Sequence, residues 1–112
     1  MKRCFLVLFA CILAGLVASS PATASASGVP FSWGDNYYGQ LGDGTTNNRI
    51  TPAQISGLTN IIAVSAGCSH SLAVITDGSV WAWGRNEDGR VGDGSGYDAL
   101  TPAKVVGLTN AV

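Results

Sequence analysis

Apolar residues are unevenly distributed along this chain. Residues 4–18 form an apolar run broken only by Gly15, and no acidic residue occurs before Asp35. Beyond about residue 30, short apolar segments alternate with loops rich in Gly, Asp and Asn. Segments of five to eight residues between turn residues are typical of β-strands, because helices need longer periodic stretches. The pattern therefore predicts an apolar leader followed by an all-β domain without helices.

The leader has the three parts of a secretory signal peptide. Lys2 and Arg3 form a basic start, the apolar run follows, and small or polar residues fill 19–26. Both ATA (22–24) and ASA (24–26) fit the small-x-small cleavage rule. We therefore expect residues 1–26 to be a signal peptide with a helical apolar part, cleaved before Ser25 or Ser27.

Two other fates of the leader are conceivable. A retained anchor needs roughly 20 apolar residues to span a bilayer, and the run at 4–18 is shorter. A lipid-anchored product starting at Cys11 requires a cut inside the apolar run. Export is the better interpretation, which predicts a secreted, extracellular, periplasmic or cell-surface product with no membrane contact after cleavage.

Size and charge restrict the function of the remaining 86 residues. Without Lys2 and Arg3 the formal net charge changes from −1 to −3, with four basic against seven acidic residues. Such a chain forms at most one small domain, so a two-domain enzyme is excluded. It has no basic surplus to neutralise phosphates, so we expect no nucleic acid partner.

The second half of the chain repeats the first at an offset of 50 residues. The offset holds without insertion from FSWGDN at 31–36 and WAWGRN at 81–86 to the C-terminus. The other matching pairs are GDG at 42–44 and 92–94, TPA at 51–53 and 101–103, and GLTN at 57–60 and 107–110. A period of this length indicates a repeat architecture built from one supersecondary unit.

Each repeat unit is predicted to hold four short antiparallel strands. Asp77-Gly78 is a two-residue hairpin signal between two apolar segments, and 84–98 is a long loop. Trp81 and Trp83 are two residues apart, so they share one face of a strand and are expected in the core. The predicted strands of the complete unit are 60–66, 69–76, 79–83 and 102–106. This is one blade of a β-propeller.

Three segments resemble the regulator-of-chromosome-condensation repeat. They are WGDNYYGQLGDGT (33–45), AGCSHSLA (66–73) and DGSVWAWG (77–84). The resemblance covers nearly all of residues 31–112 and implies an all-β fold from a seven-bladed β-propeller. The repeats start near 31 and 81, with 27–30 as a short linker after the signal.

The resemblance also implies that the ring is incomplete. Seven blades of about 50 residues need roughly 350. The chain holds half a blade (31–57) and one complete four-stranded antiparallel blade (60–107). A blade packs both faces on its neighbours, so residues 27–112 alone are not expected to form a stable monomer. The chain is interpreted as a fragment of a longer propeller, a self-assembling homo-oligomer, or a poorly folded remnant, the first being favoured.

No residue is assigned a catalytic, cofactor-binding or metal-binding role. Cys68 and His70 share a strand face, but the resemblance implies a structural role for the histidine. Cys68, the only cysteine left after cleavage, is expected to be buried or, less favoured, paired with another chain. The loop residues Asp43, Asn47, Asn48, Asp93 and Asp98 lack the spacing of a calcium loop and fit ordinary turn chemistry.

Three functions compete. The first is a non-catalytic module of an exported propeller that binds a protein or a surface, including neighbouring blades. The second is inhibition of an extracellular enzyme such as a β-lactamase. The third, implied only by the family resemblance, is guanine-nucleotide exchange on a small GTPase. Export and the acidic balance disfavour the third, and no cofactor is expected for any of them.

Overall fold

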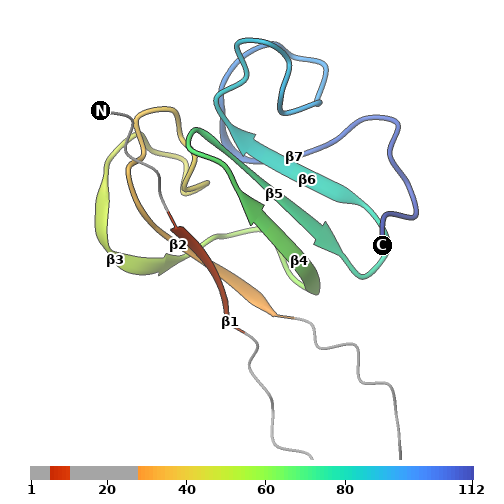
Figure 1. Ribbon diagram of the computed structural model, residues 1–112, viewed down its shortest axis with the longest axis horizontal. Coiled ribbons are helices and arrows are strands. Elements are labelled where there is room, and N and C mark those ends of the chain that lie inside the picture. Colours follow the sequence, from red (N-terminus) through yellow and green to blue (C-terminus); the bar gives the residue numbers. More distant parts are fainter. Residues whose placement is uncertain (1–5, 11–27) are drawn as a thin grey trace, which may run out of the picture.

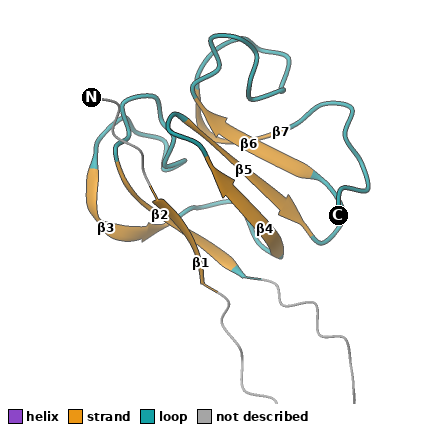
Figure 2. Cartoon of the chain, in the orientation of Figure 1, coloured by secondary structure: helices purple, strands orange, loops and turns teal. Residues whose placement is uncertain are grey.

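A computed structural model describes residues 6–10 and 28–112, which form two antiparallel sheets (Figure 1). The first sheet has the order β1-β2-β3 and the second β4-β5-β6-β7. All the described segments are strands or loops (Figure 2). The strands are β1 (Leu6–Ala10), β2 (Val29–Gly34), β3 (Arg49–Gln54), β4 (Ile61–Ala66), β5 (His70–Ile75), β6 (Val80–Gly84) and β7 (Ala99–Lys104). The all-β class and the complete four-stranded blade are confirmed.

Strand β7 differs from the prediction of 102–106. It starts at Ala99, so Pro102 lies inside the strand instead of at its first residue. The pairing of β6 with β7 is irregular between Ala82 and Gly84, and Pro102 falls opposite that interruption. An edge strand tolerates proline there because the missing N–H is not needed for a regular ladder.

The expected signal helix is not found at Leu6–Ala10, which forms strand β1. The rest of the leader lies outside the described residues. β1 pairs antiparallel with β2 and places Leu6 opposite Trp33, in the position that Ser71 of β5 occupies opposite Trp83. The apolar segment thus takes the place of the strand that the half blade lacks. The physical reason is that β2 would otherwise leave an edge of unpaired backbone groups, which an extended apolar segment satisfies.

The 50-residue period is visible in backbone pairing. The N–H of Ile61 donates to the carbonyl of Gly28 (3.4 Å), and the N–H of Ala111 donates to that of Gly78 (3.0 Å). These two bonds tie the start of one unit to the unit before it. The chain therefore repeats the connection between units as well as the units themselves.

The hydrophobic core lies where the first sheet meets the second. Ile55 and Leu58, from the connection after β3, pack with Ile61, Ala73 and Trp83 of the second sheet. Trp83 is completely buried, whereas Trp81 is half-buried against this cluster. The expectation that both tryptophans pack is confirmed, with Trp83 as the central residue.

The opposite face of the second sheet is uncovered over β4 and β5, whereas Val80 and Ala82 of β6 on the same face are buried. Side chains alternate between the two faces of a strand, so Leu72 and Val74 lie on the face opposite to the core residue Ala73. Ala63 pairs with Val74 and therefore shares that face. Ala63 is exposed, and Leu72 and Val74 are half-buried. A shallow hollow of about 190 Å³ lies over β4 and β5, lined by Ala63, Val64, Ser65, Leu72, Ala73, Val74 and Val80. Among the described residues, no second sheet covers this face.

Burial predicts that Trp83→Ala is far more destabilising than Tyr37→Ala. Trp83 has 0% exposure and Tyr37 has 72%. Truncating a buried tryptophan costs about 3–5 kcal/mol, a large share of the stability of a small domain. Urea unfolding followed by circular dichroism measures both variants against the unaltered chain. Equal midpoints for the two variants would contradict the core assignment.

Candidate interaction surface

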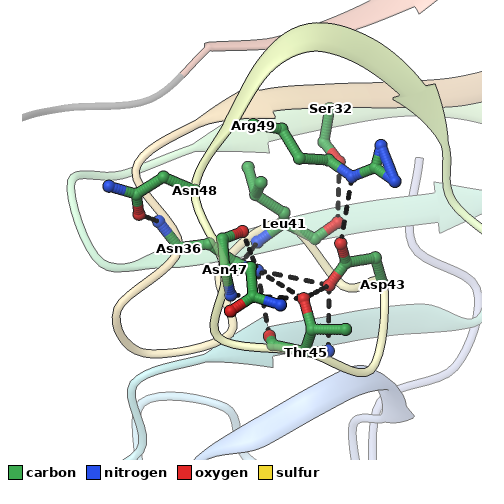
Figure 3. Close-up of polar contacts among 8 residues, drawn as sticks. All are labelled: Ser32, Asn36, Leu41, Asp43, Thr45, Asn47, Asn48 and Arg49. Carbon is green, nitrogen blue, oxygen red and sulfur yellow. Dashed lines mark hydrogen bonds and ion pairs between the residues drawn. The ribbon is translucent and has the colours of Figure 1, made fainter.

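A buried asparagine organises the loop that connects β2 to β3 (Figure 3). The Asn36 side chain has 0% exposure. Its Nδ2 donates to the carbonyls of Thr45 (2.9 Å) and Asn47 (3.0 Å) and to Asp43 Oδ1 (3.2 Å). Its Oδ1 accepts from the N–H of Leu41 (3.0 Å). One amide thus binds both arms of the loop, since it offers two donors and an acceptor in one plane.

The loop between β6 and β7 contains the same arrangement 50 residues later. Asn86 Nδ2 donates to Asp93 Oδ1 (3.1 Å) and to the carbonyl of Tyr97 (3.0 Å). Its Oδ1 accepts from the N–H of Val91 (2.9 Å). Among the described residues, no buried side-chain nitrogen or oxygen is left without a partner. Both loops lie at the same end of the molecule, where β2 and β6 finish (Figure 1).

The N-terminal end of each loop is fixed by a fourth repeated bond. The N–H of Asn36 donates to Asn48 Oδ1, and that of Asn86 donates to Asp98 Oδ1, both at 2.8 Å. Amide and carboxylate oxygens are equivalent as acceptors here. The sequence difference between positions 48 and 98 is therefore neutral for loop geometry.

The carboxylate of Asp43 is held ionised within the loop. Partial burial acts to raise its pKa, but hydrogen bonds from Thr45, the guanidinium of Arg49 and Asn36 outweigh burial and keep the pKa below the ordinary 3.8. Arg49 Nε lies 3.2 Å from Asp43 Oδ2. The pKa of Asp93 is also lowered, first by the backbone N–H of Ser95 and then by its hydroxyl. Both carboxylates are occupied as hydrogen-bond acceptors within their own loops.

The loop carboxylates are engaged in hydrogen bonds within their own loops. No group of three or more metal-ligating side chains of His, Cys, Asp or Glu occurs among the described residues. Asp43 and Asp93 lie in different loops and bond their own backbone. Their arrangement fits the turn chemistry expected from the sequence.

Cys68 is exposed and disulfide-bonded, so the prediction of a buried thiol is wrong. It lies in the turn between β4 and β5, where the N–H of Gly67 donates to the carbonyl of His70 (2.8 Å). This tight turn leaves a side chain at position 68 outside the core. A sulfur engaged in a disulfide is not a thiolate nucleophile. His70 is half-buried at the start of β5.

The first loop also forms the joint between the half blade and the complete blade. The carbonyl of Gln40 accepts from Trp83 Nε1 (2.9 Å) and from Ser71 Oγ (2.8 Å). A Cβ at Gly42 would lie 2.7 Å from Trp83 Nε1, so only glycine allows the loop to reach this ring. The N–H of Gly44 donates to the carbonyl of Leu100 (2.9 Å). The sequence indicated that these glycines are turn residues. It did not indicate their contact with the next blade, because the contacting residues lie 40 or more positions apart along the chain.

Exposed aromatic rings border the two loops. Tyr37 has 72% exposure and Tyr97 has 80%. Tyr37 meets Tyr38 edge to face with centroids 4.9 Å apart, and the guanidinium of Arg85 lies 4.7 Å from the Tyr38 centroid. No local sequence pattern marks these rings as a surface, since their exposure depends on how the loops fold. Among the described residues, no helix is apolar and long enough to cross a membrane.

The network predicts different outcomes for two Asn→Asp variants. Asn36→Asp replaces the two donors with acceptors that face the Thr45 and Asn47 carbonyls, and we expect a loss of more than about 2 kcal/mol. Asn48→Asp keeps the acceptor that position 98 already uses, so its effect should stay within about 0.5 kcal/mol. Urea unfolding at neutral pH measures both, and an equal loss would show that the amide donors do not hold the loop.

The comparisons with known proteins agree with this architecture. A family model described as Regulator of chromosome condensation (RCC1) repeat matches residues 27–74 and 77–112, and a second model of the same description matches 61–90. Protein RCC2 homolog of Danio rerio is 36% identical over 76 residues, 66% of this chain and 15% of the relative. The mouse secretion-regulating guanine nucleotide exchange factor is 46% identical over 59 residues, 50% of this chain and 12% of the relative.

Two solved structures show the same fold. Human WBSCR16 has a TM-score of 0.60 at 26% identity, covering 70% of this chain and 23% of that one. Prp20p from Saccharomyces cerevisiae, reported with its binding to Gsp1p and histones, has a TM-score of 0.59 at 24% identity, covering 69% and 19%. The chain thus spans about a fifth of the length of these structures and less of the curated relatives. With both repeats matched by the family model, this chain belongs to the regulator of chromosome condensation (RCC1) repeat family.

Proposed function

We propose that the chain is a non-catalytic, protein-binding repeat module of an exported protein. The observation that carries protein binding is the pair of rigid loops that present Tyr37 and Tyr97 to solvent at one end of the molecule. Tyrosine is enriched at binding hot spots, because a large ring contributes contact area at a small cost in side-chain entropy. A loop held by a buried asparagine loses little further entropy on binding.

The neighbouring pair of Arg85 and Tyr38 extends this surface. The guanidinium lies over the Tyr38 ring and is also paired with Glu87. Arginine and tyrosine side by side form the kind of mixed apolar and polar area that protein interfaces favour. The reported binding of Prp20p to Gsp1p and histones supports a protein partner for this module, although the similarity to Prp20p is restricted to the fold.

The proposal of export depends on the sequence of the leader, with its basic start, apolar run and Ala-x-Ala sites. Cleavage after export would remove strand β1, because Leu6–Ala10 lies before both predicted cleavage sites. The half blade would then have an open edge at β2. Export would therefore leave the half blade in need of another strand.

Mass spectrometry of the product from the producing cell tests export. We expect a mature chain that begins at Ser25 or Ser27, recovered outside the cytoplasm. An intact Met1 in the membrane fraction would establish a retained anchor. An intact chain recovered from the cytoplasm would contradict export and leave β1 in place.

Site-specific photo-cross-linking tests protein binding. A photoreactive phenylalanine analogue placed at Tyr37 or at Tyr97 should capture the same protein in both cases. The same analogue at Gln54, which is exposed at the far end of β3, is the matched control and should capture nothing. Equal capture at all three positions, or none at the tyrosines, would contradict the proposal.

The captured protein also separates the alternatives raised by the sequence. An extracellular enzyme that loses activity on binding would indicate an inhibitor. A small GTPase that releases nucleotide faster would indicate exchange activity. With the purified partner, Tyr37→Ala combined with Tyr97→Ala should weaken binding about tenfold or more.

A further inference from the structure

The chain carries the two complementary halves of one joint at its opposite ends. In the joint between the half blade and the complete blade, the loop at 36–48 supplies a carbonyl and three glycines. The complete blade supplies an indole and a strand that begins with Ala99 and Leu100. Because the chain repeats every 50 residues, a second loop and a second indole-bearing strand pair exist, and within the described residues they do not meet.

The loop half of the unused joint is at 86–98. Arg90 occupies the position of Gln40, whose carbonyl accepts from Trp83 Nε1. Gly89 and Gly94 occupy the positions of Gly39 and Gly44. The asparagine network holds this loop in the same form as the first, as the matching bonds of Asn86 show.

Two of the glycine contacts that the first loop makes are missing from the second, whereas Gly92, the counterpart of Gly42, lies against Val105 of its own blade. A Cβ at Gly39 would lie 2.4 Å from the Leu100 side chain, whereas Gly89 has nothing within 4 Å. Gly94 also has nothing within 4 Å, although its counterpart Gly44 donates to the Leu100 carbonyl. Within the part of the chain that the structure describes, the Arg90 carbonyl and the Gly94 N–H have no hydrogen-bond partner.

The strand half of the unused joint is on the first sheet. Trp33 occupies the position of Trp83 and is half-buried instead of completely buried. Ile50 occupies the position of Leu100 and is 97% exposed. Covering the Ile50 side chain would remove apolar surface from water, which favours association at this position.

The sheet faces beside the two halves are complementary as well. The second sheet leaves its face with Leu72 and Val74 open, with an apolar hollow of about 190 Å³. In the first sheet, Phe31 and Trp33 are half-buried. They correspond to Trp81 and Trp83 of the second sheet, which face the core between the two sheets. Docking the two faces would repeat the packing already present between the sheets.

We propose that copies of this chain assemble head to tail through this joint. The loop at 86–98 of one copy docks on Trp33 and Ile50 of the next, and Trp33 Nε1 donates to the Arg90 carbonyl. The Gly94 N–H donates to the carbonyl of Ile50. The occupant is a second copy because it presents the surface that the loop already recognises inside one chain. The contact is heterologous, so each dimer keeps one free half of each kind and growth continues until a ring closes.

The docking contacts come from Gly89, Arg90 and Gly94 and not from the Tyr97 ring of the same loop, whose counterpart Asn47 is exposed in the existing joint. Three variants of the full chain test the inference. Ile50→Lys places a charge on the strand half, where the exposed side chain contributes nothing to the monomer. Gly89→Asn adds a side chain to the loop half; Asn tolerates the positive φ of 73° at Gly89, and the space there is empty. Val106→Lys is the matched control, because Val106 is 70% exposed and its counterpart Ser56 is exposed in the existing joint.

Sedimentation velocity over a range of concentrations gives the result. We expect the unaltered chain and Val106→Lys to assemble, and Ile50→Lys and Gly89→Asn each to weaken assembly by roughly tenfold or more. Circular dichroism should show the same folded spectrum for all four chains.

Mixing the two defective variants tests the head-to-tail geometry directly. Ile50→Lys retains an intact loop half and Gly89→Asn an intact strand half, so an equimolar mixture should form a one-to-one dimer that grows no further. A mixture that stays monomeric would overturn the head-to-tail contact. A monomeric unaltered chain, or unspecific aggregation that neither variant reduces, would overturn self-assembly through this joint.

Discussion

The buried amide of Asn36 is the interaction on which the rest of the structure depends. Its four hydrogen-bond partners belong to both arms of a long loop, and no water reaches it. A net contribution of about 1 kcal/mol for each bond is modest, but a buried amide without partners would cost about 1–3 kcal/mol for each lost group. The loop is therefore restricted to the conformation that satisfies this side chain.

That conformation sets the position of the next blade. Gln40 follows Asn36 by four residues, and its carbonyl is aimed at the Trp83 indole because the Leu41 N–H is held by Asn36. Gly42 then approaches the ring so closely that no side chain fits. A local hydrogen-bond network thus becomes the link between two sheets. Since Asn86 forms the same network, the second loop has the geometry of a link as well.

The relation between repetition and function follows from this arrangement. The asparagine and the aspartate at the centre of the network, Asn36 with Asp43 and Asn86 with Asp93, are identical in the two units. Exposed side chains of the loops differ: Tyr37 corresponds to Glu87, and Tyr97 to Asn47. Substitution is free where a side chain points into solvent, because loop geometry does not depend on it. The surface that distinguishes one repeat from the other is therefore the surface that we propose for partner recognition.

The sequence by itself determined the period, the strand content and the class of this protein. Fifty-residue spacing of glycines, short apolar segments and the Asp77-Gly78 turn are local signals, and β4, β5 and β6 formed where those signals predicted. The sequence also indicated that the complete blade would have two apolar faces. For the candidate surface it indicated the polar loops, but not their buried asparagines, because an isolated Asn in a turn usually faces water.

Only the tertiary structure decided which residues are covered. Cys68 was expected inside and is exposed, since the turn after β4 holds it outside the core. The start of β7 was misplaced because a break in its pairing with β6 accommodates Pro102. The sequence pattern predicts a helical leader at Leu6–Ala10, but these residues pair with β2. An extended apolar segment pairs there because the edge of β2 would otherwise have unpaired backbone groups. Each of these outcomes depends on contacts between residues far apart in the chain, which no local pattern encodes.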